Sequence, residues 1–161
     1  FALSAPIKIY SALMLADDLS EGKSFYMKEV DTIKEMISRS QEGTANLFLF
    51  DEIFKGTNTT ERIAVAKAVL SYLNTTDNII VTSTHDAELA TLLDTEYDLY
   101  HFSEVIQDET FSFDYKLKSG PLYQRNAIRL LEINGFPPTV IRDAYRTIEK
   151  ISYPPTSTQP L

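Results

Sequence analysis

Two adjacent carboxylates, Asp51 and Glu52, directly follow the apolar run Leu47–Phe50. A short unbroken apolar run is typical of a strand buried on both faces of a parallel sheet. Ligands of open α/β sheets bind beyond the carboxyl ends of the strands. A carboxylate there is costly unless it has a partner, and hydrated Mg²⁺ bound to nucleotide phosphates is a common one. The run therefore indicates a nucleotide site, although by itself it equally fits a strand that ends in an acidic turn.

A histidine occupies the corresponding place after the next apolar run, residues 78–83. An isolated histidine after a strand is more often structural than catalytic. The carboxyl ends of neighbouring parallel strands border one crevice, however, so we expect His85 to lie beside the acid pair. We therefore expect that Asp51 would orient the water shell of a Mg²⁺ ion and that Glu52 would accept a proton from the attacking water. His85 would sense or hold the γ-phosphate, and most of the catalysis in such sites is positioning and electrostatics.

A polar loop with Gly22 and Ser24 precedes an expected helix and is a third candidate, because backbone N–H groups at a helix N-terminus bind anions. The tripeptide Gly22-Lys23-Ser24 looks like the end of a Walker A phosphate-binding loop. That loop requires a glycine five positions before its Gly-Lys pair, and Asp17 stands there. We therefore reject Walker A at this position and find none elsewhere in the sequence.

The elements that must position these residues alternate between strand and helix. Hydrophobic periodicity predicts strands over 7–15, 46–50 and 78–83, and helices over 24–40, 60–73 and 87–93. The inward face of the first helix is expected to hold Tyr26, Val30, Ile33 and Ile37, and its wet face Lys28, Glu29, Asp31, Lys34 and Glu35. The buried stripe of the second is Ile63, Ala66, Leu70 and Leu73. This order predicts parallel βαβ units with right-handed crossovers.

The pattern changes after the third helix. Residues 97–102 and 111–118 alternate between polar and apolar and are expected to form an antiparallel hairpin at a sheet edge, with His101 solvated. Helices are predicted over 122–133 and 138–151, and a disordered tail over 153–161. An apolar stripe on the last helix consists of Val140, Ile141, Ala144, Tyr145 and Ile148.

Length and composition set outer bounds. The 161 residues predict one domain with a real core, and the net charge of -8 argues against a surface that grips nucleic acid over most of its area. The sequence has no cysteine, which excludes disulfides and thiolate metal sites and is compatible with the predicted cytoplasmic location. There is no apolar run of about 18 residues that would span a membrane. The first residue is Phe rather than Met, so we expect a fragment of a longer chain.

Four segments resemble motifs of the MutS family of DNA mismatch repair ATPases, and they follow one another along this chain in the same order as in that family. The segment Leu-Phe-Leu-Phe-Asp51-Glu52-Ile53-x-x-Gly56-Thr57-Asn58 resembles the Walker B segment of that family, and Thr84-His85-Asp86-x-Glu88-Leu89 resembles its His switch. The segment Asp17-Asp18-Leu19-x-x-Gly22-x-Ser24-x-x-Met27-x-Glu29 is similar to its signature loop and helix. Residues 123–151, with Asn126-Ala127-Ile128 and Gly135-Phe136-Pro137, resemble its helical dimerisation segment. The resemblance covers residues 7–151.

The resemblance implies an ABC-type P-loop NTPase fold, with residues 1–120 as the C-terminal part of the ATPase domain and 121–152 as the dimerisation segment. ATP and Mg²⁺ would be bound in composite sites of a homodimer, and ATP turnover would be coupled to mismatched or distorted DNA through domains that this sequence lacks. Glu52 and His85 would be catalytic, and Asp51 would hold Mg²⁺ through water. The implied nucleotide contacts are Gly22, Ser24, Asp51 and Thr84, with Ser24 reaching the partner's nucleotide, and the implied dimer contacts are Asn58, Asn126, Ile141 and Tyr145.

Two other readings stay open at this point. Leu19-Ser20-x-Gly22 resembles the Leu-Ser-Gly-Gly-Gln signature of ABC transporters and SMC-like ATPases, but Ile53 stands where those families usually have Pro or Ala. A non-catalytic dimerisation module of a divergent MutS paralogue is the third reading, since the stripe on the last helix could pack on a partner. Lys55-Gly56-Thr57 also differs from the Gly-Arg-Gly-Thr form expected in mismatch repair, which leaves the branch open. Without Walker A, the fragment alone is predicted to be inactive.

Overall fold

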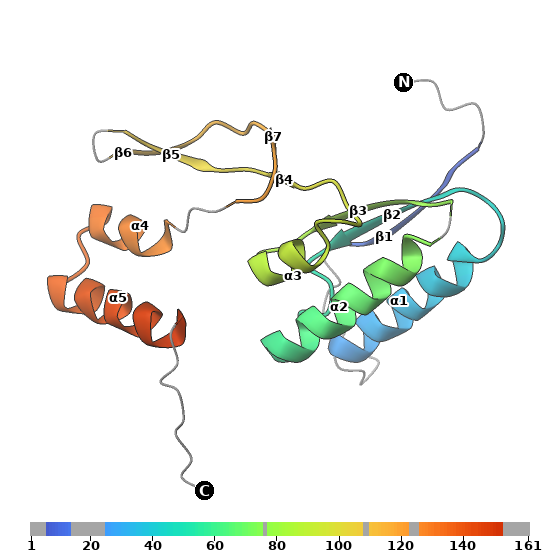
Figure 1. The fold of residues 1–161 in the computed structure, drawn as a ribbon, viewed down its shortest axis with the longest axis horizontal. Coiled ribbons are helices and arrows are strands. Elements are labelled where there is room, and N and C mark those ends of the chain that lie inside the picture. The colour runs from blue at the N-terminus through green and yellow to red at the C-terminus, as the bar shows by residue number, and fades with distance from the viewer. Residues whose placement is uncertain (1–5, 14–24, 76, 108–109, 123–125, 153–161) are drawn as a thin grey trace, which may run out of the picture. The chain divides into compact units, whose positions relative to one another are not determined.

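The computed structural model describes residues 6–13, 25–75, 77–107, 110–122 and 126–152. These belong to two compact units, Phe1–Leu99 and Tyr100–Leu161, which are treated separately below (Figure 1). The functional boundary predicted after residue 120 stays a prediction. Among the described residues, no helix is long and apolar enough to cross a membrane.

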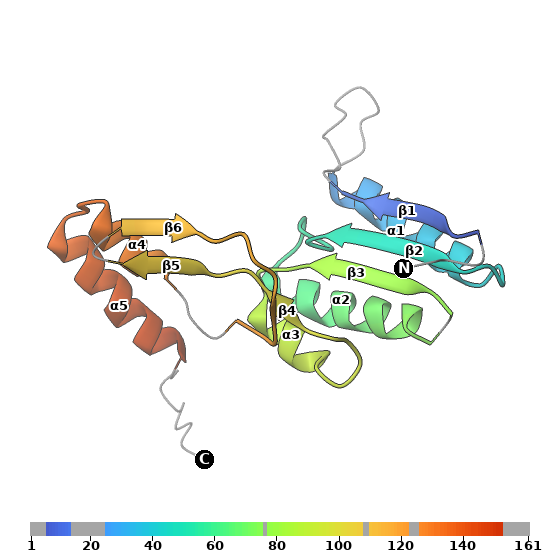
Figure 2. The ribbon, with the colours of Figure 1, turned by 90° about the horizontal axis from the view of Figure 1, so that it is seen from above.

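The first unit is a small parallel sheet with connecting helices, so the predicted mixed α/β class is confirmed. Its strands are β1 (Lys8–Ala12), β2 (Asn46–Asp51) and β3 (Ile79–Ser83), in the order β1-β2-β3. Its helices are α1 (Phe25–Ser40), α2 (Thr59–Leu73) and α3 (Ala87–Leu92). Figure 2 shows the three strands side by side with the same direction. The elements lie within a few residues of their predicted positions in the described part of the chain.

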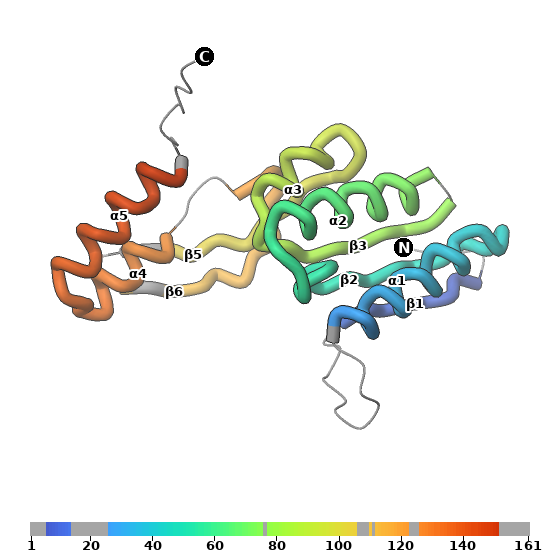
Figure 3. Tube along the Cα trace, turned by 90° about the horizontal axis from the view of Figure 1, so that it is seen from below, coloured from blue at the N-terminus to red at the C-terminus, as the bar shows by residue number. Residues whose placement is uncertain are grey.

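The core lies between one face of this sheet and the helices α1 and α2, which Figure 3 shows together on that face. Phe48 and Phe50 of β2 point into it and are almost fully buried. The predicted inward residues of both helices are confirmed, because all of them are buried in or packed against this cluster. Burial of these two large aromatic side chains against the helices stabilises the packing of β2 on α1 and α2.

The opposite face of the sheet is open among the described residues. Ile79 and Val81 of β3 and Ile9 of β1 are 47%, 55% and 66% exposed, and Leu47 and Leu49 are only half-buried. The prediction that the central strands are buried on both faces is therefore wrong for the chain as described. The physical reason is that two successive right-handed crossovers running in one direction place both helices on the same side of the sheet.

The second unit contains two short antiparallel ladders and two helices. Strand β4 (Tyr100–His101) pairs with β7 (Lys118–Ser119), and β5 (Glu104–Gln107) pairs with β6 (Thr110–Phe113). The predicted antiparallel pairing of 97–102 with 111–118 is confirmed at His101 and Lys118, whereas residues 111–113 pair with 104–106 instead. The predicted place at the edge of the parallel sheet is wrong, because neither ladder belongs to that sheet among the described residues. Alternation of polar and apolar residues does not specify a strand's partner, and Tyr115, with φ of 52°, interrupts the second predicted strand.

His101 and the helix pair complete this unit. His101 Nδ1 lies 2.8 Å from the carbonyl oxygen of Gly120, so the prediction of a simply solvated ring is wrong. Helix α5 (Pro138–Ser152) begins where predicted, whereas α4 (Ala127–Ile133) begins after Asn126 rather than at residue 122. Gly135, with φ of 73°, lies in the turn between these helices, where the left-handed conformation favours glycine.

Candidate functional site

Asp51 and Ser83 end neighbouring strands and lie directly opposite each other in the parallel register. The Ser83 hydroxyl donates a hydrogen bond of 2.6 Å to Asp51 Oδ1, and Lys55 Nζ lies 3.7 Å from Asp51 Oδ2. The hydrogen bond from Ser83 and then the charge of Lys55 lower the pKa of Asp51. Asp51 is therefore ionised at neutral pH. Sequence reasoning missed Ser83, and the in-register end of the next strand is the signal that could have found it.

Glu52 leaves the strand in a left-handed conformation, with φ of 54°, which is uncommon for any residue other than glycine, Asn or Asp. Its backbone N–H donates to the carbonyl oxygen of Ser83 at 3.1 Å. The Glu52 side chain is 26% exposed, and its Oε1 lies 2.8 Å from Nε2 of His85. The structure thus brings Glu52 and His85 together at the carboxyl edge of the sheet, as their places after neighbouring strands predict, and their chemical roles stay predictions.

Helix α1 holds the turn that follows Glu52. Glu29, predicted to be solvent-facing, is only 5% exposed, and its Oε1 accepts hydrogen bonds from the backbone N–H groups of Phe54 and Lys55. The prediction that Glu29 faces solvent is wrong, because the two backbone N–H groups give its carboxylate hydrogen-bond partners in the interior. Gly56 packs on the same helix, and an added Cβ would lie 2.8 Å from Cβ of Tyr26. Only glycine fits this close approach without displacing the helix or the turn.

The turn after β3 is held differently. The Thr84 hydroxyl accepts the backbone N–H of Asp86 at 3.0 Å, which makes a local turn. The Asp86 carboxylate accepts two hydrogen bonds of 2.8 Å from the guanidinium group of Arg62 on α2, and this pairing lowers the pKa of Asp86. The side chain of His85 between them is 94% exposed. Arg62 was missed in the sequence, because nothing in its spacing from Asp86 indicates a contact between α2 and this turn.

The remaining predicted residues of the first unit are less informative. Gly22 and Ser24, like Asp17 and Asp18 before them, lie outside the described residues. Asn58, predicted at a dimer interface, is the N-cap of α2, and its Oδ1 accepts the backbone N–H of Glu61 at 3.0 Å. This cap explains the residue type by itself.

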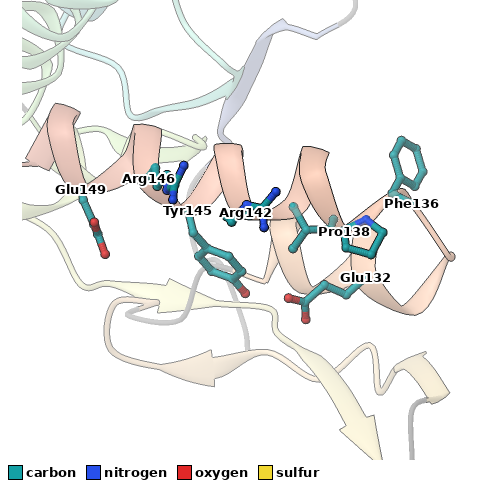
Figure 4. A pocket seen from close by; sticks show the side chains of 8 residues that line it. Glu132, Phe136, Pro138, Arg142, Tyr145, Arg146 and Glu149 are labelled. Atoms are coloured by element: carbon teal, nitrogen blue, oxygen red, sulfur yellow. The ribbon is translucent and has the colours of Figure 1, made fainter.

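The predicted interface residues of the second unit have contrasting surroundings. Asn126 donates a hydrogen bond of 3.2 Å to Oε2 of Glu104, and Ile141 is almost buried within its own unit. Tyr145 is 46% exposed, and Val140 and Ile148 of the same stripe are exposed to a similar degree. Residues of α4, of the connecting turn and of α5 line an open groove of about 520 Å³ (Figure 4). Its lining residues are Glu132, Phe136, Pro138, Ile141, Arg142, Tyr145, Arg146 and Glu149.

The chemistry available at the sheet edge is that of hard oxygen ligands and one imidazole. Within the described ranges, no group of three or more His, Cys, Asp or Glu residues could hold a metal ion entirely by protein ligands. Mg²⁺ commonly keeps several waters and binds through one or two carboxylates plus the phosphates of its substrate. An ionised Asp51 with the Ser83 hydroxyl beside it fits that mode of binding.

Comparison with known proteins supplies the family relation. The family model described as MutS domain V matches residues 2–152. The DNA mismatch repair protein MutS of Lactobacillus delbrueckii subsp. bulgaricus is 30% identical over 149 residues, covering 89% of this chain and 17% of the relative. The proteins of the same name from Listeria monocytogenes serotype 4a and Streptococcus pyogenes serotype M5 are 29% and 27% identical, over 89% and 94% of this chain. The chain thus spans about a sixth of the length of these relatives.

Proposed function

The chain belongs to the MutS domain V family, and from this membership we propose that it forms part of an ATPase that couples ATP turnover to binding of mismatched or distorted DNA. The relatives are named DNA mismatch repair proteins, which supports the DNA side of the proposal. The ATPase side rests on the site at the carboxyl edge of the sheet. The alternative that the chain is part of an ABC transporter or an SMC-like ATPase is not favoured, because the match to the MutS domain V family covers almost the whole chain.

The observation that carries the proposal is the 2.8 Å separation of Glu52 Oε1 and His85 Nε2 directly beside the Asp51–Ser83 pair. A carboxylate, an imidazole and an ionised carboxylate are thereby gathered at one strand-end edge from residues up to 34 positions apart. Ligands of open α/β sheets bind at this edge. A general base and an oxygen ligand for a cation are the groups that hydrolysis of a nucleotide requires from the protein.

In the proposed mechanism each residue has a separate task. Glu52 accepts the proton of the attacking water through its carboxylate, whose direction is set by the left-handed backbone and by the hydrogen bond to Ser83. Asp51 and Ser83 would hold Mg²⁺ through its water shell, and the bound ion would neutralise charge on the phosphates. The His85 side chain is 94% exposed beside Glu52, so it can contact a γ-phosphate, and Thr84 shapes the turn that carries it.

The finer features of the proposal concern parts beyond this chain. We propose an ABC-type P-loop fold in which a Walker A loop from the longer parent wraps the phosphates, with Gly22 and Ser24 facing the nucleotide of a partner subunit. Among the described residues one face of the small sheet is open, which leaves room for such additional elements. The complete protein would be a homodimer that contacts DNA through other domains.

The test is Mg²⁺-dependent ATP hydrolysis by the full-length protein that carries this sequence, with and without duplex DNA containing a mismatch. We expect turnover whose rate changes on addition of DNA, and no turnover by the 161-residue chain alone. A full-length protein that fails to hydrolyse ATP would overturn the proposed activity. Turnover by the isolated chain would overturn the requirement for an external phosphate-binding loop.

A second function, dimerisation, is favoured by the exposed stripe on α5. Tyr145 lines the groove together with Arg142 and Arg146, and Val140 and Ile148 add exposed apolar surface on the same helix. Aromatic and arginine side chains are enriched at protein interfaces. Sedimentation of the chain at several concentrations should show a dimer. Tyr145→Ser should weaken this dimer, whereas Tyr100→Ser, which changes another exposed tyrosine of the same unit, should leave it intact. A strict monomer would count against this function.

A further inference from the structure

Glu29 is a buried carboxyl group whose hydrogen bonds all lead to one turn. It lies in the second turn of α1 and is 5% exposed, and its Oε1 accepts the N–H groups of Phe54 and Lys55, the latter at 3.3 Å. Burial raises the pKa of Glu29 in spite of these hydrogen bonds. A buried carboxyl group is costly even when partly paired, and the contacts that its oxygen makes to the turn are ones that an apolar residue could not make.

The turn that Glu29 holds has an unfavourable backbone. Glu52 and Phe54 both have positive φ values, 54° and 62°, within three consecutive residues. Such a backbone is strained for a residue other than glycine and persists only where the surroundings over-determine it. Helix α1 supplies part of these surroundings, because Tyr26 packs its ring 6.4 Å from that of Phe54 and its Cβ against Gly56. On the other side, the Glu52 N–H is held by the carbonyl oxygen of Ser83.

We propose that Glu29 is a positioning residue, which fixes the conformation of Glu52 by anchoring the Phe54 and Lys55 amides to α1. The inference rests on the function proposed above for Glu52. Glu29 itself does not touch the reacting atoms. It acts by holding the backbone that follows Glu52, in which Glu52 and Phe54 are left-handed, so that Glu52 stays directed toward His85.

The two oxygens of Glu29 make the proposal testable. Oε1 makes both hydrogen bonds to the turn, whereas Oε2 is buried without a hydrogen-bond partner among the described residues. Positioning therefore needs one acceptor and no charge. Glutamine keeps that oxygen acceptor, and methionine has nearly the same size and shape but offers only a weakly accepting sulfur.

The experiment compares Glu29→Gln with Glu29→Met in the full-length protein, with Glu35→Met as a control on the exposed side of the same helix. ATP hydrolysis gives kcat and KM, and hydrogen–deuterium exchange of peptides covering residues 53–56 reports on the turn. We expect Glu29→Met to lower kcat by up to about 100-fold, since misplacement of a catalytic group by about 1 Å has that effect. KM should change little, exchange in 53–56 should accelerate, and exchange in β2 should stay slow.

Glu29→Gln and Glu35→Met should keep both the slow exchange and most of kcat. Equal impairment in the Gln and Met variants would overturn the proposal, because the acceptor would then not be what the turn requires. Unchanged exchange in Glu29→Met would overturn it as well. A Glu52→Gln variant measured alongside distinguishes failure of the proposed function from failure of the proposed role of Glu29. Normal hydrolysis by Glu52→Gln would refute the role of Glu52. Slow amide exchange of residues 53–56 in Glu29→Gln but not in Glu29→Met would still show that Glu29 holds the turn.

Discussion

The two turns at the carboxyl edge of the sheet are built in opposite ways. The turn after β2 carries Glu52 and is anchored from the interior, through the buried Glu29, the buried side chain of Phe54 and the contact of Gly56 with Tyr26. The turn after β3 carries His85 and is anchored near the surface, through the Arg62–Asp86 ion pair and the hydroxyl of Thr84. The side chain of Glu52 is 26% exposed, whereas that of His85 is 94% exposed.

This contrast suits two different tasks. A general base must stay within hydrogen-bond reach of its water, so a rigid backbone that is fixed by buried contacts favours it. A residue that responds to a γ-phosphate must reach solvent and change partners, which an exposed imidazole on a surface turn can do. The contrast predicts that changes in the first turn affect rate and folding most, and that changes in the second have smaller effects.

The largest effect should come from Glu52→Gln in the full-length protein. We expect hydrolysis to fall by about 10²–10⁴-fold with nucleotide binding largely intact, because the variant lacks the proton acceptor but keeps the side-chain shape. His85→Ala should cost less, since it removes a group that is not needed to accept the proton. Single-turnover hydrolysis and nucleotide titration measure both, and equal losses in the two variants would remove the proposed division of tasks.

A second contrast is in stability. Gly56→Ala should lower the free energy of unfolding by about 1–3 kcal/mol, because the new methyl group overlaps the helix at Tyr26. Lys55→Ala, one position away and on an exposed side chain, should change it little. Urea unfolding of the 161-residue chain measures both variants. Equal stability of Gly56→Ala and the parent sequence would mean that the first turn is not tightly packed on α1.

The ion pair of the second turn should contribute less. Arg62→Met or Asp86→Asn should destabilise the chain by roughly 1 kcal/mol, since the pair is bidentate but partly exposed. The double variant should lose less than the sum of the two, because each change removes the same interaction. The double-variant cycle in urea gives the coupling energy. Arg39→Met, which breaks the two exposed ion pairs of Arg39 with Glu35 and Glu42, is the control. Strict additivity would show that the pair does not hold this turn.

The smallest effects should be in the pH dependence of stability. The lowered pKa of Asp51 stabilises the folded state. This contribution is fully present when the pH is above about 3.9, the pKa of Asp in an unfolded chain, and is lost as the pH falls through the lower pKa of the folded state. Ser83→Ala should therefore reduce stability above pH 4 and converge with the parent sequence in stronger acid. The raised pKa of Glu29 has the opposite sign, so Glu29→Gln should gain on the parent as pH rises above 4.5. Urea titrations at several pH values test both signs.

Much of the site could be predicted from the sequence, because the order of strands and helices brings its residues to one edge of the sheet. The acid pair and the histidine follow neighbouring apolar runs, and parallel strands bring such ends to one edge of the sheet. Ser83, Arg62 and Glu29 could not be identified in this way. Their partners lie 24 to 32 positions away in the sequence, and the contacts depend on strand register and on where each helix crosses the sheet.

The sequence by itself determined the alternation of strands and helices, the inward stripes of α1 and α2, and the placing of Asp51, Glu52 and His85 at strand ends, because these follow from local periodicity and chain order. The tertiary structure alone decided which sheet face is covered, which short strands pair in the second unit, and that Glu29 is buried. Those features depend on the hand of the crossovers, on register and on competition for buried hydrogen-bond donors, which involve residues far apart in the chain.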